Sequence, residues 1–282
     1  MCGILAVFCR ESKFDFQHID TLFTSAEKRG QDGCGYVLIK KNPTTGKREI
    51  FDTYRNVKSY SDCKGDLERN LRSKNGGEIG DLILGICRAA PESEPATDPD
   101  RIVETLQPIV NQEHRLAVIH NGAVSNKIHQ ELKSWASDGG YKFNTEVDSE
   151  SIIASYIKHQ KHIVDTMEYL SGGFSVLLFD EQQDRLYMIN DFKPLSWGYV
   201  RGLGLMVHSN LDPIEKVTYD VTNCPRCGIA LWEDFYFHPI SGPRVQSIDL
   251  QSGFVRKQKY SPRYLTQTWD SNAKLLKSKR GI

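Results

Sequence analysis

The chain has no excess charge of either sign and no long apolar run. Its 282 residues include 36 basic and 36 acidic side chains, so no overall field points to nucleic acid or to a membrane surface as a partner. The apolar runs are of strand length and fall far short of the ~20 residues that span a bilayer. The first residues lack the charged start and apolar stretch of a secretory signal. These absences predict a cytoplasmic protein without a membrane segment, large enough for one sizeable domain.

Cysteine is also sparse, with seven residues in the chain. Without a secretory signal, these are predicted to be reduced thiols rather than a disulfide framework. Cys224 and Cys227 form one Cys-x-x-Cys pair. A structural zinc needs four ligands, and beyond His208 and His238 no further candidates lie near. Two free thiols in a loop are therefore favoured, and no metal site is predicted.

The apolar pattern predicts many short strands with helices grouped in two stretches. Residues 41–80 are polar and are expected to form loops or a solvent-facing hairpin. Because strands and helices do not alternate regularly, the pattern predicts a layered α+β architecture. The expected helices are Phe16–Lys28, Lys127–Ser137, Ser149–Lys158 and Ile163–Leu170, and the expected strands are Cys2–Phe8, Cys34–Ile39, Leu82–Cys87, Leu116–His120, Phe174–Phe179, Arg185–Ile189 and Gly204–His208.

A change of composition near the C-terminus divides the chain into two parts. Residues 255–282 contain eight basic side chains and one acidic side chain, interleaved with aromatic residues. We expect residues 1–254 to form one domain and 255–282 to form a basic C-terminal tail. Such a tail suits nucleic acid or an acidic partner, although a solvated tail that packs a few aromatic rings on the domain is the simpler interpretation.

Cys2 follows the initiator-type Met1, so removal of Met1 would give it a free α-amine beside its thiol. An α-amine titrates near ~8, and a nucleophile paired with its own terminal amine is an established catalytic arrangement. The alternative for Cys2 is an ordinary buried thiol in a strand.

Further polar groups stand where expected strands end or helices begin, where a rigid sheet can direct them toward one site. The guanidinium of Arg88 can hold a carboxylate by a two-pronged contact, and Asp148 can hold an ammonium group. The side-chain amide of Asn121 and the backbone N–H of Gly122 can bind an oxyanion. Each group also has a structural alternative: an ion pair for Arg88 with the acidic loop 92–94, a tight turn for Asn121-Gly122, and a helix N-cap for Asp148.

In the order of its motifs, the chain resembles the class II glutamine amidotransferases. This N-terminal-nucleophile family hydrolyses glutamine to glutamate and ammonia. The resemblance covers roughly residues 1–210 and rests on seven segments: Met1-Cys2-Gly3-Ile4, the turn 29–35 (Arg-Gly-Gln-Asp-Gly-Cys-Gly), the strand end 85–90 (Gly-Ile-Cys-Arg-Ala-Ala), His120-Asn121-Gly122, 147–150 (Val-Asp-Ser-Glu), 172–175 (Gly-Gly-Phe-Ser) and 193–198 (Lys-Pro-Leu-Ser-Trp-Gly).

The resemblance implies a four-layer αββα sandwich of the N-terminal-nucleophile hydrolase type, with residues 1–254 as the glutaminase domain. It implies Cys2 as the nucleophile, Asn121 and Gly122 as the oxyanion hole, and Arg88 with Asp148 as anchors for the glutamine carboxylate and ammonium. The family reaction needs no metal or organic cofactor. Two further residues would shape the loop beside the nucleophile rather than perform chemistry: Arg29 and Asp32.

Some positions depart from the family pattern. Ile86 stands where a histidine is usual, Ala89-Ala90-Pro91 replaces a bulkier sequence, and Ala123 follows the Asn-Gly pair. The chain also lacks room for a synthase domain after residue 220, so we expect the ammonia to pass to a separate synthase or ligase. Two alternatives stay open: an amide hydrolase for another substrate, and a non-catalytic regulatory or binding relative.

Overall fold

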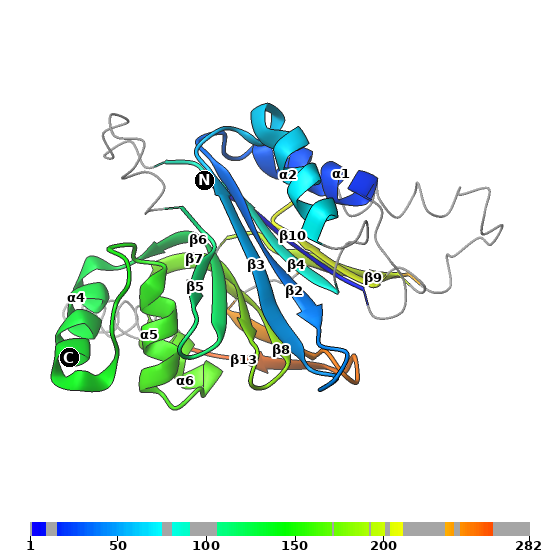
Figure 1. The fold of residues 1–282 in the computed structure, drawn as a ribbon. Coiled ribbons are helices and arrows are strands. Elements are labelled where there is room, and N and C mark those ends of the chain that lie inside the picture. Colours follow the sequence, from blue (N-terminus) through cyan, green and yellow to red (C-terminus); the bar gives the residue numbers. More distant parts are fainter. Residues whose placement is uncertain are drawn as a thin grey trace, which may run out of the picture.

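Two antiparallel β-sheets pack face to face, and helices cover both outer faces (Figure 1). The computed structural model describes residues 2–9, 16–74, 81–90, 106–170, 172–191, 193–200, 204–210, 235–239 and 243–261. Among the helices of these ranges, none combines the length and the apolar composition that crossing a bilayer requires.

The first sheet has seven strands in the order β11-β9-β10-β1-β4-β2-β3. Their bounds are β1 Gly3–Phe8, β2 Cys34–Lys41, β3 Arg48–Asn56, β4 Leu82–Cys87, β9 Ser196–Val200, β10 Gly204–His208 and β11 Phe235–Pro239. The second sheet has six strands in the order β13-β12-β8-β7-β6-β5. Their bounds are β5 Ile109–Asn111, β6 Leu116–Val124, β7 Gly172–Asp180, β8 Arg185–Asp191, β12 Arg244–Asp249 and β13 Val255–Lys259.

Helices α1 (Phe16–Glu27) and α2 (Tyr60–Lys74) cover the seven-stranded sheet. Helices α4 (Asn126–Trp135), α5 (Glu150–Lys158) and α6 (Ile163–Tyr169) cover the six-stranded sheet, and a π-helical segment η1 (Ala136–Gly140) follows α4. The order of layers is thus helix, sheet, sheet, helix, as the αββα prediction requires.

Strand alternation explains how each sheet serves two cores. In β1, Leu5 and Val7 pack under α1 and α2, whereas Ile4, Ala6 and Phe8 point toward the other sheet, because successive side chains of a strand face opposite sides. We call the core between the sheets the inner layer. It contains β1 and β4 side chains from one sheet and β6, β7 and β8 side chains from the other, among them Ile4, Ala6, Phe8, Leu84, Ile86, Ala117, Ile119, Leu177, Phe179, Leu186 and Met188.

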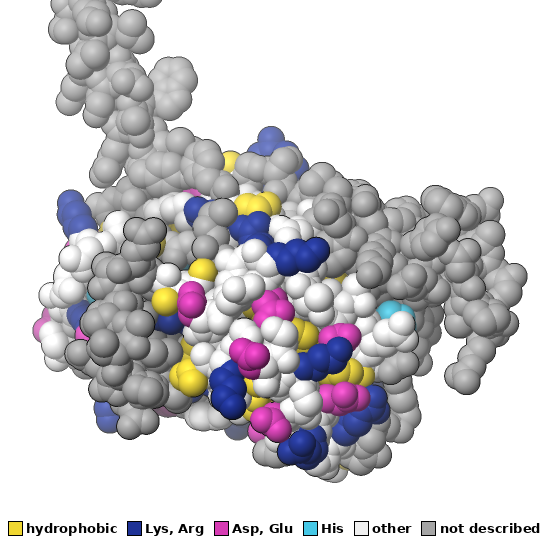
Figure 2. Space-filling model, turned by 90° about the horizontal axis from the view of Figure 1, so that it is seen from above, with side chains coloured by type: hydrophobic (Ala, Val, Ile, Leu, Met, Phe, Trp, Pro, Cys, Tyr) yellow, Lys and Arg dark blue, Asp and Glu magenta, His cyan; other side chains and the backbone are white. Residues whose placement is uncertain are grey.

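Helix α2 lies in the range 41–80 that was expected to be loops or a hairpin, so that prediction was wrong for residues 60–74. Only one stripe of α2 is apolar: Tyr60, Cys63, Leu67 and Leu71 are buried. Its other side faces solvent, where Figure 2 shows acidic and basic side chains interspersed on the face seen from above. A single apolar stripe suffices to pack a helix on a sheet. The remaining positions of α2 are polar, so its sequence did not predict a helix.

Two other boundaries differ from expectation. Strand β6 does not stop at His120 but runs on to Val124, so Asn121-Gly122 lies inside a ladder and is not a tight turn. Strand β13 falls within the expected basic tail and pairs with β12, and Tyr260 beyond it is buried. We propose that the domain extends to at least Tyr260; residues 262–282 of the expected tail lie outside the described residues.

Candidate active site

Cys2 stands at the start of β1 with its side chain against the inner layer. By strand alternation its side chain points to the same side of the sheet as Ile4 and Ala6. It is half-buried and packs against the inner-layer core. The backbone N–H of Ala89 donates to Sγ at 3.4 Å, and Sγ lies 3.8 Å from the Ala89 carbonyl oxygen. The thiol is therefore held beside the backbone that follows β4, and it is not the fully buried thiol of the structural alternative.

The turn at residues 29–33 grips both Cys2 and the chain after β4. Arg29 Nε donates to the Cys2 carbonyl oxygen at 3.2 Å, and Asp32 Oδ2 accepts from the Ala90 N–H at 2.8 Å. The Asp32 N–H donates to the Arg88 carbonyl oxygen at 2.9 Å. Burial lowers the pKa of Arg29, and the nearby Cys2 side chain opposes this shift. These contacts support the predicted role of the turn in shaping the surroundings of the nucleophile.

A glycine is required in this turn because two backbones approach closely. A Cβ on Gly30 would lie 2.3 Å from the Arg88 carbonyl carbon and 2.5 Å from the Ala89 nitrogen. Any side chain at this position would push the turn away from the backbone that contacts Cys2.

Arg88 follows β4 directly and is buried, with 7% of its surface exposed. Its backbone N–H donates to the Gly33 carbonyl oxygen at 2.7 Å. Because Cys87 is paired with Gly3 across the β1–β4 ladder, Arg88 lies beside Cys2 at the same end of the sheet. Its alternative partners, the acidic residues 92–94, lie outside the described residues.

Asn121 lies in β6, and by strand alternation its side chain points to the same side as Ala117 and Ile119, which belong to the inner layer. It is 1% exposed, and its Nδ2 has no hydrogen-bond partner among the described residues. A buried donor left unpaired costs about 1–3 kcal/mol, so such a group calls for a ligand or a water. Strands β1 and β4 of the opposite sheet contact β6, and the predicted oxyanion donor therefore faces the layer that contains Cys2.

Gly122 has a φ of +141° in the middle of this ladder, a conformation that residues with a Cβ rarely adopt. A Cβ there would also lie 2.2 Å from the Gly173 carbonyl oxygen. Both the backbone conformation and the neighbouring strand thus require glycine next to Asn121.

Asp148 is not the N-cap of α5, contrary to the alternative considered for it; the N-cap residue is Ser149. Asp148 Oδ2 instead accepts from the Val124 N–H at 2.8 Å, which ties it to the end of β6 nearest Asn121. His120 Nδ1 lies 3.0 Å from Ser149 Oγ and helps to hold this junction. Burial lowers the pKa of His120, opposed by the nearby Asp148 carboxylate, so the ring is neutral at neutral pH.

A group of residues at the end of β10 and just after it supports the start of β1, next to Cys2. The Ile4 N–H donates to Ser209 Oγ at 3.2 Å, and Asn210 Oδ1 accepts from Arg29 Nη1 at 2.9 Å. Burial lowers the pKa of His208 to about 4. The neutral ring accepts from the Asn210 N–H at 2.8 Å through Nδ1 and lies 3.0 Å from the Leu22 carbonyl oxygen through Nε2. The sequence offered His208 only as a possible zinc ligand and gave no sign of this supporting role, because His208 ends an apolar strand.

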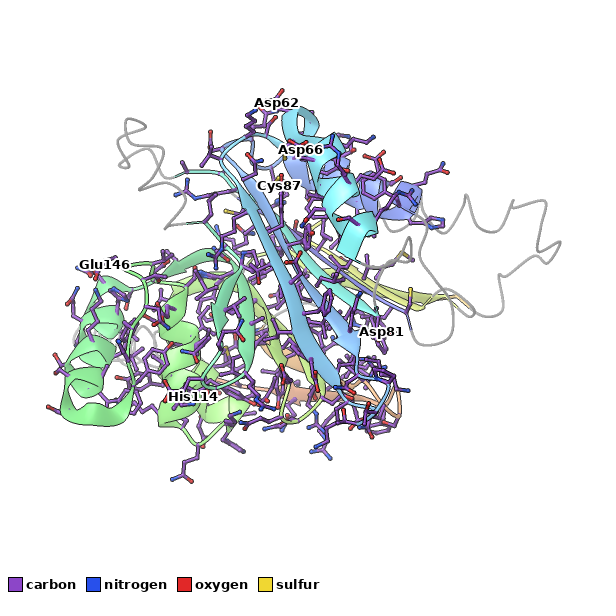
Figure 3. The ribbon with its side chains drawn as sticks, in the orientation of Figure 1. Asp62, Asp66, Asp81, Cys87, His114 and Glu146 are labelled. Atoms are coloured by element: carbon purple, nitrogen blue, oxygen red, sulfur yellow. The ribbon has the colours of Figure 1, made fainter. Side chains whose placement is uncertain are left out.

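The other described cysteines lie away from the inner layer. Cys34, Cys63 and Cys87 belong to the core under α1 and α2, and Figure 3 shows Cys87 on that helical side of the sheet. The described cysteines, including Cys2 and Cys9, are free thiols; Cys224 and Cys227 lie outside the described residues. Within the described ranges, no group of three or more His, Cys, Asp or Glu side chains could hold a metal ion.

A wide groove of about 780 Å³ lies elsewhere, beside α4 and η1. Its lining includes His114 and Glu146, which Figure 3 labels. None of the predicted site residues lines it, so its position does not bear on the chemistry of Cys2.

Comparisons with known proteins agree with this arrangement. Residues 97–216 match a family model described as a glutamine amidotransferase domain. The chain is 25% identical to a glutamine–fructose-6-phosphate aminotransferase of Clostridium tetani, over 97% of this chain and 40% of the relative. It is 24% identical to a 7-cyano-7-deazaguanine synthase of Saccharolobus solfataricus, over 75% of this chain and 43% of the relative. The chain thus spans about 40% of the length of such relatives.

A solved structure shares the fold. The glutamine phosphoribosylpyrophosphate amidotransferase of B. subtilis superposes with a TM-score of 0.64 at 19% identity, covering 92% of this chain and 49% of that one. This likeness, together with the observed layers, confirms the predicted αββα sandwich.

Proposed function

We propose that this chain carries a glutamine amidotransferase domain of the class II type, as its motifs predicted, and that it hydrolyses glutamine to glutamate and ammonia. The observation that carries the proposal is Asn121 Nδ2, which has no partner among the described residues and belongs to a side chain that faces the inner layer on which Cys2 packs. A thiol nucleophile and an oxyanion donor on facing sheets are what amide hydrolysis through a thioester needs.

The reaction begins after Met1 is removed, which frees the α-amine of Cys2. Sγ attacks the side-chain carbonyl carbon of glutamine, and the α-amine takes the thiol proton. The tetrahedral intermediate then expels ammonia, which leaves with a proton from the α-ammonium, and a γ-glutamyl thioester forms. Water attacks the thioester, the C–S bond breaks, and glutamate and the free thiol are released.

The remaining site residues have roles in binding. Asn121 Nδ2 and the Gly122 N–H would stabilise the negative oxygen of the tetrahedral intermediate. Arg88 would hold the glutamine carboxylate and Asp148 its ammonium group. Their positions support these roles, since Arg88 adjoins Cys2 and Asp148 is tied to the end of β6.

The acceptor of the ammonia is proposed to be a separate synthase or ligase. The relatives support transfer of the ammonia to an acceptor, because they are named as an aminotransferase and a synthase. Isolation of the native complex followed by identification of the co-purified enzyme tests it. A cytoplasmic location and a nucleic-acid contact through residues 255–282 stay predictions of the same kind.

Mass spectrometry and one variant test the mechanism. We expect the mature protein to lack Met1 and the Cys2→Ala variant to lose glutamine hydrolysis and labelling by a diazoketone analogue of glutamine. Cys63→Ala is the matched control, because Cys63 is a buried thiol under the helices and should leave both unchanged. Retention of Met1, or normal hydrolysis by Cys2→Ala, would overturn the proposal.

One structural feature favours a second candidate, hydrolysis of a different amide. The backbone that contacts Cys2 carries only the small side chains of Ala89 and Ala90. A screen of amides with wild type and Arg88→Met separates the two functions. A glutaminase should lose its preference for free glutamine in the Arg88→Met variant. A hydrolase of another amide has no such preference in the wild type.

A further inference from the structure

A row of polar side chains crosses the inner face of the six-stranded sheet. Asn121 of β6 pairs with Ser175 of β7, and Ser175 pairs with Asn190 of β8. Leu177 and Met188, two residues along from Ser175 and Asn190, both belong to the inner layer. By strand alternation, all three polar side chains point into that layer. We call Asn121, Ser175 and Asn190 the inner polar row.

The row lies where the inner layer meets solvent. In β6 the residues up to Asn121 are buried, and Gly122 and Ala123 beyond it are exposed. In β7 the two glycines 172 and 173 are half-buried, and burial is continuous from Phe174 onward. Asn121 and Ser175 are thus the last inward-facing buried residues before the strands open at the end where Cys2 is half-buried.

The members of the row differ in their hydrogen bonding. Asn190 Nδ2 donates to the Lys193 carbonyl oxygen. Asn121 Nδ2 and Ser175 Oγ have no partner among the described residues, although Asn121 is 1% and Ser175 0% exposed. Each buried group that lacks a partner destabilises the folded chain. Opposed residues of an antiparallel pair have Cβ atoms about 4.5–5.5 Å apart, so two open donors stand side by side.

We propose that the Ser175 hydroxyl is a further donor for the reaction, acting beside Asn121 on the oxygen that becomes negative when Cys2 attacks. The proposal rests on the proposed hydrolysis of glutamine and adds a side chain to its oxyanion site. A hydroxyl that is fixed before the substrate arrives needs no reorganisation, so its bond strengthens only as charge develops on the oxygen.

The expected effect of Ser175→Ala is a loss in kcat of about 10- to 100-fold, with KM within about twofold of wild type. Labelling of Cys2 by the diazoketone analogue should slow in parallel, since its carbonyl oxygen occupies the same donors. The melting temperature should stay the same or rise, because the substitution removes an unpaired buried hydroxyl.

Ser151→Ala is the matched control. Ser151 is also 0% exposed, but its Oγ lies 2.6 Å from His129 Nδ1, in α5 and α4. Loss of this bond should lower the melting temperature and leave kcat unchanged. The two serine variants therefore have opposite effects on rate and stability, which a purely structural role for Ser175 would not produce.

The outcomes distinguish the role of Ser175 from the proposed hydrolysis of glutamine, on which that role rests. Unchanged kcat in Ser175→Ala, while Cys2→Ala is inactive, overturns the role of Ser175 and leaves the glutaminase standing; the hydroxyl then binds a water only. A parallel fall in melting temperature and rate, with KM altered, also overturns it. If wild type neither hydrolyses glutamine nor labels at Cys2, the proposed function itself fails and the role of Ser175 fails with it.

Discussion

The two ends of the inner layer are built differently. At the end where β1 finishes at Phe8, which we call the far end, opposite charges are paired directly across the sheets. Arg48 of β3 donates to Asp184, in the turn between β7 and β8, at 3.0 Å, with the two side chains 4% and 6% exposed. The Arg48 guanidinium also lies 4.9 Å above the Phe8 ring. At the other end, the site end, Asn121 Nδ2 and Ser175 Oγ have no partner among the described residues. The far end also has buried atoms without a partner, Arg48 Nε and Asp184 Oδ1, but they belong to two side chains that already bind each other.

If glutamine is hydrolysed at the site end, as proposed, this difference separates the groups that stabilise the sandwich from those that act on the substrate. Glu181 adds a second link at the far end, accepting from the Ile50 N–H at 3.0 Å. Because the sheets are joined there by polar contacts between them, the site end can keep unpaired donors that would otherwise weaken it. Changes at the far end should therefore alter unfolding, and changes at the open donors should alter rate.

The largest effect is expected at the far end. Arg48→Met leaves the Asp184 carboxylate buried without its cation, which should lower the free energy of unfolding by about 3–5 kcal/mol. Urea unfolding measures this. The double variant Arg48→Met/Asp184→Leu should recover most of the loss, because no lone charge stays buried.

The exposed pair of Arg72 and Glu68 gives the control for that result. Arg72 Nε lies 2.8 Å from Glu68 Oε1, and the two side chains are 46% and 34% exposed. Arg72→Met should therefore lower the free energy of unfolding by about 0.5 kcal/mol or less. Equal losses in Arg48→Met and Arg72→Met would mean that the far end does not join the sheets.

The next effect belongs to the site end and concerns rate. Asn121→Ala should lower kcat about 10²- to 10³-fold, the usual result of removing one oxyanion donor, with little change in urea unfolding. Asn111→Ala is the control, because Asn111 is also a buried asparagine but donates to Tyr141 Oη at 3.0 Å. This variant should unfold at a lower urea concentration and keep the wild-type kcat. If Asn121→Ala instead loses stability and keeps its rate, the two ends do not differ in kind.

The sequence predicted the strands best where apolar runs are buried on both faces. Strands β1 and β4 were expected within one residue of their bounds, because both of their faces lie in cores and a continuous run results. Helix α2 escaped prediction, since only one stripe of it is buried and its mean composition is polar.

For the site, the order of motifs predicted the fold and family, and the expected strand ends pointed to Cys2, Arg88 and Asn121, although β6 runs on past Asn121. The support from His208, Ser209 and Asn210 could not be predicted, because it depends on the pairing of β10 with β1, which are some 200 residues apart in the chain. The unpaired state of Ser175 likewise appears only when β6, β7 and β8 are in register.

A pH test sharpens the comparison through His208, a buried group at the site end. Its pKa is about 4 in the folded chain against 6.5 unfolded, so the unfolded chain binds more protons between these values. Stability should therefore fall as pH drops from 6.5 to 4, by about 3 kcal/mol from this residue. Urea unfolding at a series of pH values should show a flatter slope in this window for His208→Gln. An unchanged slope would show that the ring is not held neutral.

The smallest expected effect tests whether pairing, rather than location, decides the behaviour of a residue. Asp32 lies at the site end but is paired, since its Oδ2 accepts from the Ala90 N–H at 2.8 Å. Asp32→Ala should lower the free energy of unfolding by about 1 kcal/mol, a shift in melting temperature of about 2–4 °C, and Asp32→Asn should restore part of it because an amide oxygen still accepts. A loss of rate should accompany the loss of stability, because Ala89, next to Ala90, contacts Sγ. If Asp32→Ala loses only rate, location alone governs the site end, and the division between paired and open groups must be abandoned.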